Sequence, residues 1–273
     1  MAKPSAYKHV VWIFFENHSY DKVIGASGAP YINSLAARCG LATNYHNITH
    51  PSLPEYIAAT SGLSLASLAP FTGDCNPTGS CTTKAKSIFA QGESWGAYED
   101  SMPSACDRND AGNYAVRHNP ATYYTTLTGC STNDVPYREL STDLAKDALP
   151  AFSFITPNLI NDMHNGTVED GDRWLAHNLP TILRSAEYTR GTMAVFITWD
   201  EGEGGTSDNC ATNTTDVGCH VAALVVSPST PAGARSGKLF NHYSLLSTAE
   251  QLLGLPKLGE AASYPSMVSA FNL

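Results

Sequence analysis

The stretch "VVWIFFENHSYD", residues 10–21, joins an apolar run to a cluster of polar side chains. Its first six residues are β-branched or aromatic and do not alternate with polar ones, which is typical of a strand covered on both faces of a parallel sheet. Glu16, Asn17 and His18 follow directly. An exposed loop is soluble with almost any polar residues, so a carboxylate, an amide and an imidazole together at the end of a buried strand indicate a functional site.

Three other apolar runs share this composition and, with residues 9–15, predict four buried strands: "AFSFI" (151–155), "MAVFITW" (193–199) and "HVAALVVS" (220–227). We expect helices in segment 29–39 and in the segments that begin at 52, 170 and 243. Strands that alternate with helices predict an α/β fold with one open, mostly parallel central sheet flanked by helices.

The turn-rich stretch 66–140 holds four of the seven cysteines, and we expect it to be a loop insertion over one end of the sheet. No internal repeat or linker interrupts the chain, and 273 residues bury a large core. The sequence therefore predicts a single domain over residues 1–273.

Composition excludes two classes of partner. A net charge of −9 and a pI near 5.4 argue against binding to a nucleic-acid backbone, which requires a basic surface. The chain has no apolar run of about 18 residues, so we expect no transmembrane segment.

The cysteines indicate the compartment. Six of them form three close pairs in polar stretches, namely Cys75 with Cys81, Cys106 with Cys130, and Cys210 with Cys219. Metal binding is the alternative, but no pair has the C-x2-C spacing of a zinc knuckle. The N-terminal residues do not have the pattern of a signal peptide. We therefore expect either a cytosolic protein or a sequence that begins after a cleaved signal peptide. Disulfides favour the second alternative and a secreted protein, with Cys39 left as a buried helical thiol.

Polar side chains also follow two other predicted strands. Asn161, Asp162 and His164 come after 151–155, and Asp200 and Glu201 come directly after 193–199. Ligands of open α/β sheets bind beyond the carboxyl ends of the strands, so we expect these groups to meet in a metal site. An ordinary charged turn, a helix cap or a glycosylation sequon such as "NHS" (17–19) explains each group singly, and only their coincidence favours a site.

The segment "NITHPSLPEYIAATSG" (47–62) places Ser52 between two prolines at the start of a predicted helix. Unpaired amides and the positive end of the helix dipole favour an anion there. Ser52 is either the cap of this helix or a nucleophile whose hydroxyl a metal activates.

These motifs resemble a known family. "ENHSYD" is similar to the E-N-x-S-[FY]-D motif of the phosphoesterase family that contains bacterial phospholipases C and acid phosphatases, a branch of the alkaline phosphatase superfamily. "HPSLPEY" resembles the H-P-S-x-P-N-Y segment of its acid phosphatases, and "TWDEGEGG" resembles its late acidic pair. The matching segments span residues 10–256 in the family order, which makes the combination specific although each motif alone is weak.

The resemblance implies an alkaline phosphatase-like fold, a metal-dependent enzyme and a phosphoserine intermediate on Ser52. The implied metal ligands are Glu16, Asn17, Asp200, Glu201 and Ser52 itself. An oxygen-rich set with nearby imidazoles suits zinc, manganese, calcium or magnesium.

The histidines have no single assignment. His118, His164 and His242 are the candidates to protonate the leaving alcohol. Further residues of the matching segments are expected to bind substrate phosphate or complete a second metal site: His50, His220 and Asp162.

Glu55 departs from the family pattern, which has asparagine in this position. An asparagine donates a hydrogen bond to a phosphate oxygen, whereas an ionised carboxylate cannot. Three interpretations stay open for Glu55 as a substrate-binding candidate: it pairs with an ammonium on an ethanolamine or choline headgroup, it binds metal, or it faces solvent in the first helical turn.

Three functions therefore compete. The HPS segment favours an acid phosphatase-like phosphomonoesterase, and Glu55 favours a phospholipase C-like phosphodiesterase acting on phospholipid headgroups. The third is an exported binding module without turnover, supported by the cysteines and the 13 tyrosines.

Overall fold

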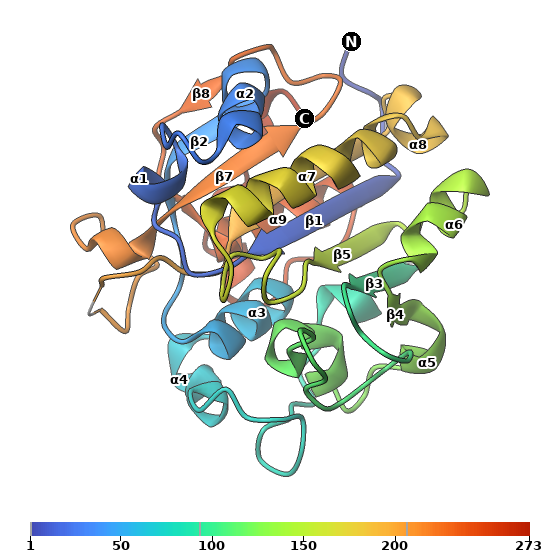
Figure 1. Ribbon diagram of the computed structural model, residues 1–273, viewed down its shortest axis with the longest axis vertical. Helices are drawn as coiled ribbons and strands as arrows, with labels where there is room; N and C mark the ends of the chain where they lie inside the picture. Colours follow the sequence, from blue (N-terminus) through green and yellow to red (C-terminus); the bar gives the residue numbers. More distant parts are fainter. Residues whose placement is uncertain (1, 93, 206) are drawn as a thin grey trace.

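The computed structural model describes residues 2–92, 94–205 and 207–273, and a central sheet carries helices on both faces (Figure 1). Over these residues the sheet has nine strands in the order β4-β3-β5-β1-β6-β7-β2-β8, with β9 beside β2. The strands are β1 His9–Phe15, β2 Gly40–His46, β3 Trp95–Glu99, β4 Asp134–Pro136, β5 Phe152–Thr156, β6 Met193–Trp199, β7 His220–Val226, β8 Arg235–Ser236 and β9 Phe240–Asn241.

The α-helices of the described residues are α1 Tyr20–Val23, α2 Pro30–Arg38, α3 Ser52–Ser61, α4 Leu65–Leu68, α5 Cys130–Asn133, α6 Glu139–Ala145, α7 Val168–Leu183, α8 Ala186–Thr189, α9 His242–Leu252 and α10 Val268–Phe271. Short 3-10 helices lie in the connections, among them η3 Val116–His118 and η4 Pro120–Tyr123. No helix in this part of the chain is long and apolar enough to cross a bilayer.

The sheet is mostly parallel, as predicted. β4, β3, β5, β1 and β6 pair in parallel, whereas β7 runs antiparallel to both β6 and β2. β1 and β6 begin and end at the predicted residues, β5 lies one residue later than predicted, and β7 ends one residue earlier. The predicted α/β class is confirmed.

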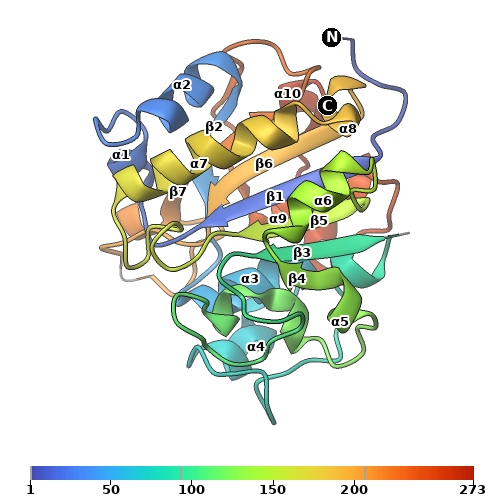
Figure 2. The same ribbon diagram turned by 45° about the vertical axis from the view of Figure 1, so that its right-hand side comes forward.

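Different helices cover the two faces of β1. Phe14 packs against Tyr56 of α3 and His242 of α9, with ring centroids 5.5 and 5.3 Å apart. Phe15 packs against Trp174 of α7, at 6.0 Å. Successive strand side chains point to opposite faces, so α3 and α9 cover one face and α7 covers the other (Figure 2). Each such buried aromatic side chain contributes about 1.5–3 kcal/mol to folding.

Two expectations about the chain's organisation need correction. The segment 66–140 is not only an insertion, because its residues 95–99 and 134–136 form β3 and β4, which extend the sheet beyond β5. The helix expected from 170 begins at Val168, because Thr167 caps it in a reciprocal pair with Asp170.

The three predicted disulfides are present: Cys75–Cys81, Cys106–Cys130 and Cys210–Cys219. Cys39 is a free, half-buried thiol directly after α2. Cys75–Cys81 closes a short loop in the connection between α4 and β3, Cys106–Cys130 lies in the connection between β3 and β4, and Cys210–Cys219 lies in the loop between β6 and β7.

The topology gathers several chain segments at one edge of the sheet. β1, β5, β6 and β2 all end there, and antiparallel β7 begins there at His220. α3 starts at Ser52, a short turn after β2. Residues that follow the predicted strands therefore lie side by side.

Candidate active site

Glu16 and Asn17, which follow β1, meet Asp200 and Glu201, which follow β6, at this edge of the sheet. Phe15 and Trp199 are register partners in β1 and β6, so Glu16 and Asp200 follow neighbouring positions. The Asn17 amide donates to Asp200 Oδ1 at 3.1 Å, and the Asp200 amide donates to the Phe15 carbonyl at 2.9 Å. Asn17 has a φ of 51°, a left-handed conformation that asparagine tolerates better than most residues, and it turns the chain out of β1.

Ser52 lies between these pairs. Its hydroxyl donates to Glu16 Oε2 at 2.9 Å and lies 3.5 Å from Glu201 Oε1. Ser52 is the first residue of α3 and not its cap, because Pro51 occupies the cap position and no side chain there accepts a helix amide. The alternative that Ser52 only caps the helix is therefore wrong.

The segment after β5 contributes to the same cluster. The Glu16 amide donates to the Asp162 carbonyl at 2.8 Å. His118, from η3, has Nδ1 3.2 Å from Asp162 Oδ2 and Nε2 3.4 Å from Glu16 Oε1. His164 also lies here, since ligand atoms of Glu16, His118 and His164 are within 4.8 Å of one another. We call Glu16, Asp162, Asp200 and Glu201 the acidic cluster.

His50 approaches the cluster from the turn before Ser52. Its Nδ1 contacts Glu201 Oε2, and its Nε2 lies 3.7 Å from the Sγ of Cys210. The side chain is half-buried, with 23% of its surface exposed. Burial lowers the pKa of His50, but the hydrogen bond and charge of Glu201 outweigh burial and raise it overall.

Two predicted residues are fully buried behind the cluster. His242 has Nε2 2.6 Å from the Asp200 carbonyl and Nδ1 2.9 Å from the Tyr45 hydroxyl. Burial lowers the pKa of His242 to about 4, so the ring is neutral, donates from Nε2 and accepts at Nδ1. Glu55 is also fully buried, so the interpretation of a solvent-facing helical glutamate is wrong.

The structure does not bring His220 to the cluster. Its Nε2 lies 3.1 Å from the Thr43 carbonyl, and its ring stacks on Tyr20 and His46 at centroid distances of 4.5 and 5.5 Å. These contacts explain the position of His220 without a ligand, and its role in substrate binding stays a prediction.

Sequence reasoning missed three residues beside Ser52. The Tyr56 hydroxyl donates to Glu16 Oε1, and Asp74 Oδ1 accepts from the Leu53 amide at 2.9 Å. Arg117 has Nη2 3.2 Å from Nε2 of His164. Two of them had a signal in the sequence: Tyr56 is four residues after Ser52, hence on the same helix face, and Arg117 directly precedes His118.

The acidic cluster gathers buried carboxyl groups whose ionised forms a bound cation would stabilise. Burial, followed by the charges of Asp200 and Asp162, raises the pKa of Glu16 well above its ordinary value. Burial and the charge of Glu201 raise the pKa of Asp200 to about 8, and Asp200 Oδ2 is buried without a hydrogen-bond partner among the described residues. Ionised carboxylates gathered away from water are stable only when paired or bound to a metal. These oxygen ligands with adjacent imidazoles fit a divalent cation.

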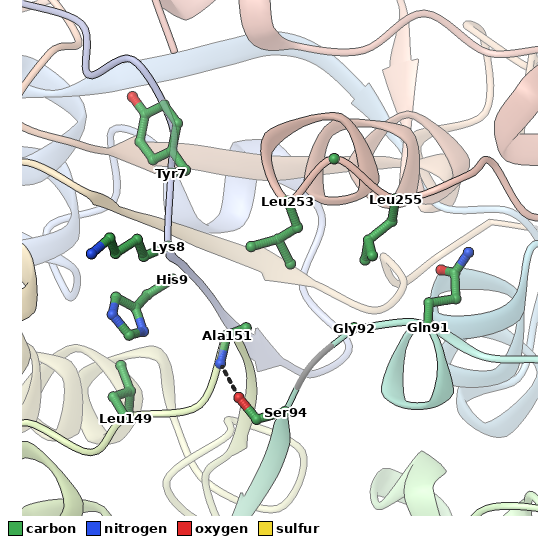
Figure 3. Close-up of a pocket in the computed structure, with 11 residues that line it drawn as sticks. Tyr7, Lys8, His9, Gln91, Gly92, Ser94, Leu149, Ala151, Leu253 and Leu255 are labelled. Carbon is green, nitrogen blue, oxygen red and sulfur yellow. Dashed lines mark hydrogen bonds between the residues drawn. The ribbon is translucent and has the colours of Figure 1, made fainter.

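A cavity of about 740 Å³ lies elsewhere, at the amino ends of the strands (Figure 3). Tyr7, Lys8 and His9 line it before and at the start of β1, and Ser94 Oγ accepts from the Ala151 amide at 2.9 Å across one side. No residue of the acidic cluster lines this cavity. The acidic cluster and this cavity thus lie at opposite ends of the strands, and we place the candidate active site at the acidic cluster.

Comparisons with known proteins identify the family of the chain. A family model described as "Phosphoesterase family" matches residues 26–256. The chain is 31% identical over 270 residues to a phosphatidylinositol-3-phosphatase of Mycobacterium tuberculosis, covering 97% of this chain and 83% of that protein. It is 28% identical to a probable acid phosphatase of Kluyveromyces lactis, covering 93% of this chain but 60% of that protein.

Solved structures support the fold alone. An alkaline phosphatase superfamily protein from Vibrio parahaemolyticus superposes with a TM-score of 0.61 at 12% identity, covering 93% of this chain and 68% of that one. Murine ectonucleotide pyrophosphatase/phosphodiesterase 5 gives 0.59 at 11% identity, covering 92% of this chain and 96% of that one. The alkaline phosphatase-like fold expected from the motifs is confirmed.

Proposed function

The chain belongs to the phosphoesterase family and is a hydrolase of phosphoric esters, and we propose that it hydrolyses phosphate monoesters with Ser52 as the nucleophile. The observation that carries the proposal is the Ser52 hydroxyl, which donates to Glu16 where the segments after β1 and β6 meet. Relatives named as phosphatases, one of them acting on a phosphatidylinositol phosphate, support a monoester substrate.

Glu16, Asn17, Asp200 and Glu201 would hold the divalent metal, with Ser52 beside them. Bound there, such an ion neutralises the carboxylates and lowers the pKa of the serine hydroxyl. The unpaired Asp200 Oδ2 and the raised pKa values of Glu16 and Asp200 support this assignment.

The remaining steps belong to the chain's own residues. Glu16 orients the hydroxyl of Ser52 toward phosphorus, and Tyr56 fixes Glu16 by donating to its other oxygen. Attack by Ser52 forms an O–P bond as the ester P–O bond breaks, and water later hydrolyses the phosphoserine. Arg117 supplies a fixed positive charge for the non-bridging phosphate oxygens.

An imidazole protonates the leaving alcohol in this proposal. His118 and His242 are buried, with 2% and 0% exposed. His164, beside Arg117, and His50, beside Glu201, are half-buried, and we take their rings as the ones that a leaving group can reach. We assign the general acid to this pair.

The main argument for the alternative function, a phosphodiesterase of the phospholipase C type, no longer holds. That alternative depended on Glu55 pairing with a headgroup ammonium, and both oxygens of Glu55 accept backbone amides instead. We further propose that the protein is exported, because three disulfides form and persist in oxidising compartments.

The test compares p-nitrophenyl phosphate with bis(p-nitrophenyl) phosphate, with and without chelator. We expect turnover of the monoester that chelation abolishes and a divalent ion restores. Ser52→Ala should reduce kcat by at least about a thousandfold while its melting temperature stays near that of the wild type. Preferential turnover of the diester, or normal activity of Ser52→Ala, would contradict the proposal.

A further inference from the structure

Glu55 makes an unusual set of contacts for a glutamate in the first turn of a helix. Its two carboxylate oxygens accept from the Ile48 amide at 3.0 and 2.9 Å, and one of them also accepts from the Thr49 amide. The Asn47 side chain lies 3.5 Å away. All of these donors belong to the turn that joins β2 to α3, so Glu55 holds the turn that precedes its own helix.

Because Glu55 is buried, both its carboxyl group and the amides of the turn depend on these hydrogen bonds. The residue is 0% exposed, and a buried carboxylate is costly unless several donors compensate it. Without Glu55, the amides of Ile48 and Thr49 would be left buried and unpaired, because no other acceptor is assigned to them among the described residues.

The same turn is held from its other side by the disulfide-closed loop after Glu201. The Cys210 amide donates to the Ile48 carbonyl at 2.8 Å, and Thr49 Oγ1 donates to the Asp208 carbonyl at 2.9 Å. The turn then continues into His50 and Ser52. Its position therefore sets where the nucleophile and His50 meet the acidic cluster.

Glu55 is also linked to the opposite half of the site. Its Oε2 lies 3.5 Å from Nε2 of His242, and that ring donates to the Asp200 carbonyl at 2.6 Å. Glu55 thus connects the turn before Ser52, through His242, to the strand end that carries Asp200.

From these contacts we propose that Glu55 is a positioning residue, which fixes the turn 47–51 so that Ser52 stays aligned with Glu16 and His50 stays aligned with Glu201. The inference rests on the proposed function only in that its kinetic test measures the hydrolysis of phosphate esters. In this inference Glu55 does not contact the substrate. Its role therefore differs from that of the asparagine that the family pattern has at this position.

The experiment compares Glu55→Gln with Glu250→Gln. Glu250 is the matched control, since it is also a buried glutamate that accepts a backbone amide, from Leu258 at 2.8 Å, but it lies on α9 away from the acidic cluster. Steady-state kinetics use p-nitrophenyl phosphate and O-phosphoethanolamine, and hydrogen–deuterium exchange follows the amides of Ile48 and Thr49.

We expect Glu55→Gln to lower kcat by about tenfold with little change in KM, and equally for both substrates, because misalignment of a nucleophile acts on the chemical step. Exchange at Ile48 and Thr49 should accelerate. Glu250→Gln should lower the melting temperature and leave kcat and these two amides unchanged.

Two results overturn the inference: a loss confined to O-phosphoethanolamine, which would make Glu55 a substrate contact, or unchanged kcat and exchange in Glu55→Gln. If Glu55→Gln does not fold, the wild type decides, since fast exchange at Ile48 and Thr49 contradicts the inference and slow exchange supports it. If the wild type hydrolyses no ester, the proposed function fails, and the exchange measurement still tests Glu55 alone.

Discussion

Arg117 lies half-buried beside carboxylates that would otherwise repel a phosphate ester. Burial lowers the pKa of His118 and the charge of Arg117 lowers it further, whereas burial raises the pKa of Asp162 and Arg117 opposes that rise. A monoester carries two negative charges near neutral pH and a diester carries one. The guanidinium should therefore matter more for the monoester.

Arg117→Ala should lower kcat/KM for p-nitrophenyl phosphate by about a hundredfold and for the bis ester by about tenfold or less. Arg117→Lys should recover part of the loss, since the lysine ammonium keeps the positive charge but lacks the planar guanidinium that can bind two phosphate oxygens at once. Arg138→Ala, at an exposed arginine, is the control and should change neither substrate. Equal losses on the two esters would remove Arg117 from phosphate recognition.

Single residues also show how far sequence reasoning reaches. Glu16, Asp162 and Asp200 could be placed together in advance because each follows a recognisable buried strand, and parallel strands end at one edge. The burial of Glu55 could not be predicted, because its partners are backbone amides, which carry no sequence signal. The same limit applies to His242, whose partners are a hydroxyl and a carbonyl from distant segments.

Among the structural elements, the loop between β6 and β7 has the closest link to the site. It begins with Asp200 and Glu201, contacts the turn before Ser52 and is closed by Cys210–Cys219. The Cys75–Cys81 disulfide closes a loop of similar length without contacting Glu201 or His50 among the described residues. The two disulfides therefore form a matched pair for experiment.

Replacing Cys210 and Cys219 by alanine should lower kcat by about tenfold, since the loop no longer fixes His50 against Glu201. Both double variants should lose stability, roughly 2–4 kcal/mol as for typical disulfides. Cys75→Ala with Cys81→Ala should retain kcat. Assays run well below both melting temperatures separate the two effects, and equal kcat in the two variants would contradict the positioning role of the loop.

Asp134, in the edge strand β4, should make the stability of the protein depend on pH. Burial raises the pKa of Asp134 to about 7, although the Asn119 hydrogen bond opposes the shift. The folded protein holds this proton more tightly than the unfolded chain, whose aspartates have a pKa near about 3.9. Its contribution is therefore fully present below about pH 4 and is lost as the pH rises through about 7.

Asp134→Asn should flatten the decline of unfolding free energy between about pH 4 and 7, measured by urea titration. Asp170→Asn should act with the opposite sign, because hydrogen bonds from Thr167 lower the pKa of exposed Asp170 and its contribution is lost as the pH falls. An unchanged slope in Asp134→Asn would show that this carboxyl does not titrate in the folded protein.

The elements that were not predicted share a physical reason. β3 "WGAYE" contains a glycine and β4 "DVP" is short and ends in proline, so neither resembles a buried strand when read alone. Their pairing with β5 and with each other supplies the stability that local sequence does not. The long apolar strands β1 and β6 needed no such context.

At the scale of the whole molecule, the cation proposed for the site would also stabilise the fold. A ligand that binds the native state and not the unfolded chain raises stability by mass action. Chelation should lower the melting temperature by several degrees, and a divalent ion should restore it, even in Ser52→Ala. Asp200→Asn should respond less to chelator, whereas an identical response in wild type and Asp200→Asn would place the ion elsewhere.

The central claim, that Ser52 carries the phosphoryl group, is tested most directly by trapping it. The protein is mixed with p-nitrophenyl phosphate in the presence of a divalent ion, quenched in acid within one turnover, digested and examined by mass spectrometry. We predict phosphate on the peptide that contains Ser52, and on Ser52 itself by fragmentation. Turnover at full rate with that peptide unmodified, or with phosphate on another residue, would contradict the account.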